Sequence, residues 1–263
     1  MRTAALTAVL SGAAAITYSA EAAVLFARMT IAPSATRKGQ IDTLIRALKT
    51  AGVWTKMDVF RVHAAHDAQA ARLNWASTSY DAAAVNSPTF TTDRGYTGDG
   101  ATSYLDSGFN PATAGGLFAQ DKAHMGVWCG TDVTASVQID VGNSRSRINS
   151  RSAGNAAIAG NTITGSNVLL PAATSVGHTC WSRTISTEFE TSKNGTVLTS
   201  SAVASAALNS LPYYELAIAA AGPAAGNFST RRVQATHWGS DLTAAERTAV
   251  YDALAAYMTA VGA

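Results

Sequence analysis

Three arginines and one asparagine alternate along a short segment of the chain. Arg145, Arg147, Asn149 and Arg151 are separated by single small or apolar residues. If this run is a β-strand, the four side chains point to one face, because successive side chains of a strand alternate between faces. Guanidinium groups are planar donors that match carboxylate and phosphate groups. The pattern predicts a ligand-binding row for acidic sugars; a solvated or subunit-pairing strand face is the alternative.

The carboxylate pair that a glycan hydrolase needs is not evident. Such enzymes place two carboxyl groups about 5–9.5 Å apart across a cleft, and the spacing Glu-x-Asp-x-(x)-Glu that supplies them on one strand does not occur. Glu188 and Glu190 share a strand face, but they suit solvated charges at a sheet edge. A Gly-x-Ser-x-Gly nucleophile elbow is also missing. We therefore expect no catalytic residues and no enzymatic activity.

Metal ligands are sparse in the sequence. His63 and His66 are three residues apart and are followed by Asp67, but no further ligands converge on them at a recognisable spacing. These histidines are expected to be structural. The alternative is a calcium ion held by Asp140 and Asn143, because both side chains offer oxygen ligands. The expectation is that the chain holds no metal and no cofactor.

The two cysteines each stand next to a tryptophan, in the pairs Trp128-Cys129 and Cys180-Trp181. Cysteines so far apart fit no zinc motif. They are expected as buried free thiols, with a disulfide joining two strands as the alternative. Trp128, Trp181 and Trp238 could stack on sugars, although burial in a core is expected for at least two of them.

The composition suits a folded chain with a large core. Of 263 residues, 47% are hydrophobic and only 14% are charged, which disfavours disorder. The net charge of +2, from 19 basic and 17 acidic residues, is too balanced to predict a nucleic-acid partner.

Residues 1–24 are rich in alanine, leucine and valine. The stretch is interrupted at Ser11-Gly12 and is too short for a convincing membrane span. We expect an apolar arm for assembly or anchoring. A secretory signal peptide is the alternative, because Arg2 precedes the apolar stretch and Ala20-Glu21-Ala22 resembles a cleavage site.

Residues 25–84 carry helical signals. Ser34 is a candidate N-cap, and the apolar residues from Ile41 to Leu48 recur at helical spacing before Gly52 ends the helix. Asp67 can cap a second helix from Ala68 to Trp75. The interpretation is a helical module that packs on a β-sandwich.

From residue 85 onward the pattern changes to strands. Apolar residues alternate with polar ones, as half-buried strands require, and Asn194-Gly195 is a strong type I′ hairpin signal. The sequence from Thr243 to Glu246 is a capping box that opens a closing helix. The expected strands include Thr102–Phe109, 123–129, 137–141, the two arms of a hairpin over 189–200, 213–220 and 230–238.

The order of these signals resembles the concanavalin A-like (laminin-G-like) jelly roll over residues 85–263. The resemblance rests on Gly98–Leu105, Ala123–Cys129, Lys193-Asn194-Gly195, Phe228–Trp238 and Leu242–Glu246. It implies a mainly β fold: a jelly-roll sandwich with N-terminal helices and a C-terminal helix.

A second resemblance covers most of the chain beyond residue 24. The segments 25–29, 41–54, 64–75, 85–91 and 93–111 look like a module of structural proteins in tailed phages and prophages, where it usually sits in fibre or appendage components. This implies a non-enzymatic virion structural protein (fibre, spike or decoration) on the exposed surface of a phage or prophage particle.

The same resemblance implies several copies in a homo-oligomer, attachment to a host surface polysaccharide, and contact with other virion proteins through the N-terminal arm. Weak carbohydrate contacts would be multiplied by copy number. The alternatives are a purely structural capsid or tail assembly protein and, less favoured, a glycan hydrolase.

Overall fold

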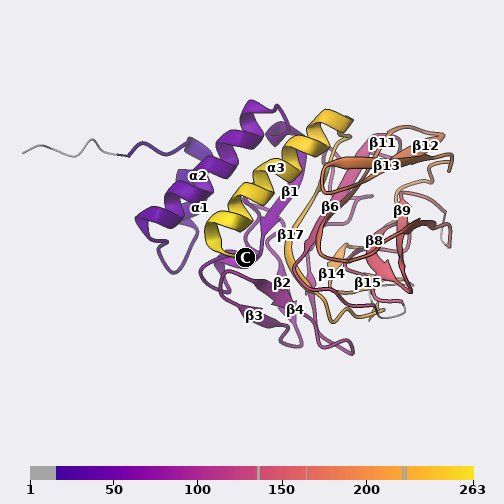
Figure 1. Ribbon diagram of the computed structural model, residues 1–263, viewed down its shortest axis with the longest axis horizontal. Helices are drawn as coiled ribbons and strands as arrows, with labels where there is room; N and C mark the ends of the chain where they lie inside the picture. The colour runs from indigo at the N-terminus through magenta and orange to yellow at the C-terminus, as the bar shows by residue number, and fades with distance from the viewer. Residues whose placement is uncertain (1–15, 135–136, 164, 221, 223) are drawn as a thin grey trace, which may run out of the picture.

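A computed structural model describes residues 16–134, 137–163, 165–220, 222 and 224–263. Two antiparallel sheets stack face to face, and three helices lie together on one side of them (Figure 1). The expected jelly-roll sandwich with N-terminal helices and a C-terminal helix is confirmed. Residues 1–15, most of the expected apolar arm, lie outside the described residues.

The first sheet has eight strands in the order β13-β12-β11-β6-β17-β4-β3, and β1 also pairs with β17. Its strands are β1 (Met57–Val62), β3 (Thr89–Thr91), β4 (Gly95–Thr97), β6 (Ala123–Cys129), β11 (Gly177–Ile185), β12 (Glu188–Lys193), β13 (Thr196–Ser201) and β17 (Arg232–Gly239).

The second sheet has seven strands in the order β10-β9-β8-β7-β14-β5-β2. They are β2 (Ala83–Val85), β5 (Tyr104–Asp106), β7 (Val141–Gly142), β8 (Ser146–Ser152), β9 (Asn155–Gly160), β10 (Val168–Pro171) and β14 (Tyr214–Glu215). A separate two-stranded ribbon consists of β15 (Ile218–Ala219) and β16 (Ala225–Gly226).

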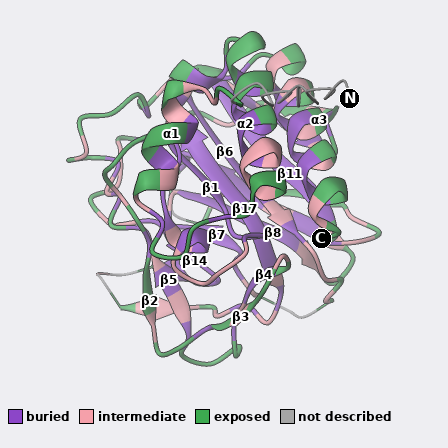
Figure 2. Ribbon diagram, turned by 90° about the vertical axis from the view of Figure 1, so that its left-hand side faces the viewer, coloured by how far each residue is buried: buried purple, intermediate pink, exposed green. Residues whose placement is uncertain are grey.

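Three helices cover the outer face of the eight-stranded sheet, over β1, β6, β11 and β17 (Figure 2). They are α1 (Ala20–Ala27), α2 (Ala35–Thr50) and α3 (Ala244–Val261). The Ser34 hydroxyl accepts from the Arg37 N–H, which confirms the expected N-cap of α2. Among the described residues, no helix combines the length and the apolar character that a membrane crossing requires.

The core explains the two-residue periodicity of β6. Met125, Val127 and Cys129 are fully buried and face the second sheet, where the Cys129 thiol lies 3.4 Å from the Ser150 hydroxyl of β8. The alternate side chains, including His124, therefore face the helices.

The predicted Asn194-Gly195 hairpin is confirmed between β12 and β13. Both turn residues have positive φ, 49° and 77°, as a type I′ turn requires.

The second expected helix, Ala68–Trp75, is wrong: the structure has only a 3₁₀ turn at Ala70–Arg72. Asp67 does cap this turn, accepting from the N–H of Gln69 and of Ala70. The turn does not continue as a helix because the side chain of Asn74 is hydrogen-bonded to the backbone at β1. Its side chain accepts from the Phe60 N–H and donates to the Asp58 carbonyl. These bonds fix the segment in an extended path beside β1.

Three further expectations also need correction. The segment 25–84, expected as a helical module, contributes β1 and β2 to the two sheets, so sheet pairing begins before residue 85. In the run 137–141, only Val141 belongs to a strand, because Val137 has a φ of 51°, a left-handed conformation outside the β region. The strand expected over Thr102–Phe109 is limited to β5.

The capping box at the start of α3 gives a first testable prediction. The Thr243 hydroxyl accepts from the Glu246 N–H, and the Glu246 carboxylate accepts from the Thr243 N–H. Thr243→Ala should lower the free energy of unfolding by about 1 kcal/mol, measured by urea denaturation. Thr259→Ala, at an exposed position late in the same helix, is the control and should leave stability almost unchanged. Equal losses in the two variants would contradict a role for the cap.

Candidate functional site

A hollow of ≈ 420 Å³ lies on the outer face of the seven-stranded sheet. Its floor is formed by β8, where Ile148 points into the sandwich core and its neighbours Arg147 and Asn149 point outward. Exposed Val137 and Leu169 stand at its rim. The described lining residues are Val137, Ile139, Ser144, Arg147, Asn149, Ser152, Ala157, Gly165, Asn167, Leu169, Ile218, Ala220 and Asn227.

Arg147 brings a positive charge to this hollow. Its guanidinium donates to the Ser144 carbonyl and, at 2.6 Å, to Oδ1 of Asn167. No carboxylate of the described residues lies within 4.0 Å of it. Burial lowers the pKa of Arg147, but an arginine stays protonated at physiological pH. The floor therefore carries a cation that is oriented by neutral oxygens and is not neutralised by an acid.

Asn149 provides the second polar group of the floor. Its Oδ1 accepts from the Arg151 N–H at 3.2 Å, and its amide nitrogen donates to no described residue. That nitrogen is available to an acceptor in the hollow. A guanidinium, an amide and an apolar rim together suit a ligand with an anionic group and hydroxyl groups.

The structure brings together two of the four predicted row residues. Arg145 precedes β8 and donates to the Ala207 carbonyl, outside the hollow. Arg151 turns away and forms an ion pair with Asp132 at 2.6 Å. The register of β8 shifts between Asn149 and Ser152, which interrupts the strict alternation. The row of four side chains on one face is therefore wrong, and only Arg147 and Asn149 share a site.

Sequence reasoning missed Asn167 and Ser144. Asn167 approaches Arg147 from the segment before β10, and Ser144 acts through its carbonyl oxygen. Nothing in their local sequence marks them, because the contact depends on how the loop before β10 folds over β8.

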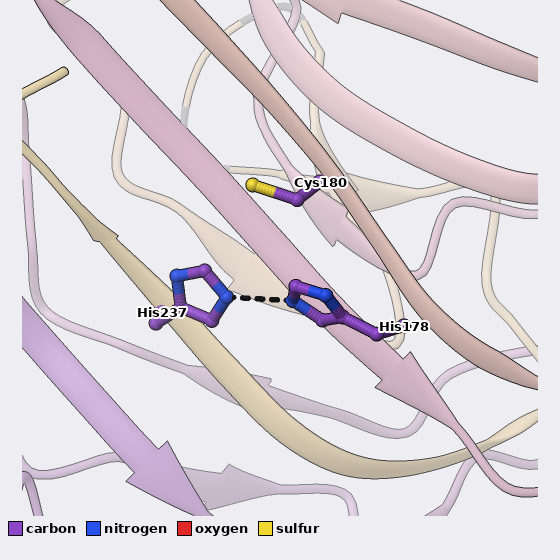
Figure 3. Close-up of side chains that lie close together, drawn as sticks. All are labelled: His178, Cys180 and His237. Atoms are coloured by element: carbon purple, nitrogen blue, oxygen red, sulfur yellow. Dashed lines mark hydrogen bonds between the residues drawn. The ribbon is translucent and has the colours of Figure 1, made fainter. Parts of the chain in front are cut away.

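A second polar cluster lies under the helices, on the outer face of the eight-stranded sheet. His178 and Cys180 of β11 and His237 of β17 gather on one side of the sheet (Figure 3). All three are buried, and their ligand atoms lie within 4.8 Å of one another. Nε2 of His178 is 2.8 Å from Nε2 of His237.

His124 extends this cluster across the sheet. Its Nε2 is 2.9 Å from Nδ1 of His237, and its Nδ1 contacts the Ser240 carbonyl. Burial lowers the pKa of His124 to about 4 and that of His178 to about 3, so both rings are neutral at pH 7. Burial likewise raises the pKa of the Cys180 thiol to about 12.

The fold has known counterparts. The structure is similar to the receptor-binding domain of botulinum neurotoxin C/D mosaic serotype, with a TM-score of 0.55 and 9% identity over 76% of this chain and 51% of that one. It is also similar to the botulinum neurotoxin DC binding domain in complex with rat synaptotagmin II, at a TM-score of 0.52 and 8% identity over 76% and 52%.

A third similar structure is a mutant Trypanosoma rangeli sialidase with trans-sialidase activity, at a TM-score of 0.52 and 10% identity over 85% of this chain and 40% of that one. The chain thus spans about half the length of the neurotoxin chains that it matches. No protein-family model and no curated protein matches the sequence. At such low identity the likeness shows the fold alone, a β-sandwich of two stacked antiparallel sheets.

The remaining candidate residues have structural partners. His63 lies 2.6 Å from Glu215 and 2.7 Å from the Ala71 carbonyl. His66 contacts the Ile31 carbonyl at 2.8 Å. Each is held within the fold, as expected for a structural histidine.

The calcium alternative fails. Asp140 is fully buried and forms an ion pair with Arg231 at 3.0 Å, and its second oxygen accepts from the Ser150 N–H. Asn143 uses its side chain to bind the backbone at Leu211 and Arg145. These contacts occupy the oxygens that a calcium ion would need.

The cysteines and tryptophans are also accounted for. Cys129 and Cys180 are buried free thiols, so the disulfide alternative is wrong. Trp181 and Trp238 are fully buried in the core. Trp128 stacks on Tyr251 of α3, with ring centroids 5.7 Å apart. None of the three is a platform for sugar stacking.

Proposed function

We propose that this chain is a non-enzymatic binding module that recognises an acidic glycan in the hollow over β8. The observation that carries the proposal is the largely buried Arg147, which lines the hollow without a carboxylate partner. A buried cation is costly unless it is paired. A carboxylate or phosphate on a sugar would supply that pair. The amide nitrogen of Asn149 would donate a hydrogen bond to a neighbouring hydroxyl of the sugar and so orient it.

The lining also bears on the kind of recognition. None of the described lining residues is aromatic, so binding depends on charge and hydrogen bonds more than on stacking. None is an aspartate or glutamate, so the described part of the hollow offers no acid–base pair for glycoside hydrolysis. Both points support binding without bond cleavage. The neurotoxin neighbours are receptor-binding domains on the same fold, which agrees with a binding role.

For the biological setting we propose a phage-type virion: an exposed fibre, spike or decoration protein, present as a homo-oligomer, that attaches the particle to a host surface polysaccharide. The support is the resemblance of segments 25–29, 41–54 and 64–75 to phage appendage modules. Mass spectrometry of purified particles should find the chain in several copies per virion. Absence of the chain from purified particles would contradict the virion setting but would leave the proposed glycan binding untested by that result.

The test of binding is Arg147→Ala. Affinity for an acidic host polysaccharide, measured by calorimetry or on a glycan array, should fall about ten- to hundredfold, because a charge-assisted hydrogen bond contributes about 1.5–3 kcal/mol. Arg145→Ala is the matched control: it removes the same charge two residues away, outside the hollow, and should leave affinity unchanged. Urea denaturation of both variants shows whether each is folded.

Two outcomes would contradict the proposal. Equal losses in Arg145→Ala and Arg147→Ala would indicate general electrostatic attraction and no specific site. Failure of the folded wild-type chain to bind any host envelope polysaccharide would favour a protein of assembly alone. Release of reducing sugar by the wild type would instead revive the hydrolase alternative.

A further inference from the structure

We infer that His178, Cys180 and His237 form a binding site for a borderline-soft divalent cation such as Zn²⁺, placed beneath α3 on the outer face of the eight-stranded sheet. The cluster lies on the opposite sheet from the hollow over β8 and is independent of the proposed glycan binding. Its ligand set of two imidazoles and one thiol is the set that zinc prefers over calcium or magnesium.

The strand register creates the site. Gly126 of β6 is paired with Cys180 on one side and with His237 on the other. Because Gly126 has no side chain, the middle of this row is open, and the rings lean into it. A Cβ atom at Gly126 would lie 2.1 Å from Nε2 of His237 and 2.9 Å from Nε2 of His178. Glycine is thus what allows the two Nε2 atoms to meet over the central strand.

The hydrogen bonds determine which nitrogen of His237 carries a proton. The Ser240 carbonyl can only accept, so His124 carries its proton on Nδ1 and presents a lone pair at Nε2. His237 must then donate from Nδ1 to His124. Its Nε2 therefore presents a lone pair toward His178. A ring oriented in this way by a further hydrogen bond is the usual arrangement of a metal-binding histidine.

The tautomer of His178 is not determined by a partner on its far side. Its Nδ1 is buried and has no hydrogen-bond partner among the described residues. Moving the proton from Nε2 to Nδ1 therefore breaks no other contact. In that form two lone pairs face each other 2.8 Å apart, an arrangement that a cation between them stabilises.

Binding requires only a small adjustment of these side chains. Zinc–nitrogen bonds of about 2.0–2.1 Å in tetrahedral geometry hold two nitrogens somewhat more than 3 Å apart. The two rings must separate by roughly half an ångström, and the Cys180 sulfur must close on the ion as it loses its proton. The thiolate would offset part of the ionic charge. The bound ion would connect β11 to β17 across β6 under α3.

Cobalt loading tests the inference. Because the site is buried, the full chain is unfolded in urea and refolded with Co²⁺, and excess ion is removed. We expect stoichiometric cobalt, a near-ultraviolet thiolate-to-cobalt charge-transfer band, and a higher midpoint of thermal unfolding than without metal. Zinc added during refolding should suppress the band.

Two cysteine variants make the result specific. Cys180→Ser should abolish the charge-transfer band, whereas Cys129→Ser, a buried thiol on the other face of the same sheet, should retain it. His178→Gln should weaken cobalt retention at least tenfold. A folded wild type without the band, or a band that depends on Cys129, would overturn the site. If Cys180→Ser does not refold, the wild-type spectrum and His178→Gln still decide.

Discussion

Glu215→Gln should destabilise the protein by about 3–5 kcal/mol, among the largest effects expected of any single substitution. Glu215 of β14 lies fully buried between the sheets and accepts hydrogen bonds from the guanidinium of Arg61 and, at 3.1 Å, from the hydroxyl of Thr236. Glutamine keeps the shape of the side chain but removes its charge. The substitution removes the buried ion-pair partner of the Arg61 cation, which costs far more than the loss of a surface ion pair.

The measurement is the free energy of unfolding from urea denaturation, with Glu188→Gln as the matched control. Glu188 lies on β12, where its Oε2 accepts from the Ser200 hydroxyl at 2.8 Å in an exposed setting. Its replacement should change stability by less than about 0.5 kcal/mol. Similar stabilities for the two variants would show that the buried carboxylate does not compensate Arg61.

Local patterns predict the regular parts of this fold well. The period-two strand Ala123–Cys129, the Asn194-Gly195 hairpin and the Thr243 capping box depend on interactions within a few residues, and all three are present. The Ala68–Trp75 helix fails for the converse reason. Its local signals are outweighed by Asn74, whose side chain binds residues of a strand some fifteen positions earlier.

The candidate sites depend on pairings that no local pattern contains. The alternation of Arg147 and Asn149 correctly predicts that the two side chains share a face. Beyond Asn149 the register of β8 shifts, and Arg151 forms an ion pair with Asp132 outside the hollow. The histidine cluster is harder to foresee. The spacing His178-x-Cys180 places both on one strand face, yet only the pairing of β11, β6 and β17 brings His237 beside them.

Gly126→Ala is the second prediction with a large effect. The added methyl would meet Nε2 of His237 at 2.1 Å, and that ring is held on both sides by His124 and His178. Making room requires His237 to leave at least one of these hydrogen bonds. Overpacking costs about 1–3 kcal/mol, and an orphaned buried nitrogen costs about 1–3 kcal/mol more. The free energy of unfolding should therefore fall by about 3 kcal/mol or more, measured by urea denaturation.

Gly39→Ala gives this prediction a control of opposite sign. Gly39 lies inside α2, and a Cβ atom there meets no other heavy atom within 4 Å. Alanine should stabilise the protein by about 0.5–1 kcal/mol, because glycine is unfavourable within a helix. The same added methyl group should thus change the free energy of unfolding in opposite directions at the two positions. The difference between the two changes reports how closely the imidazole rings pack on β6. If Gly126→Ala were as stable as the wild type, the rings could not lie against this strand, and the proposed cation site would lose its geometric basis.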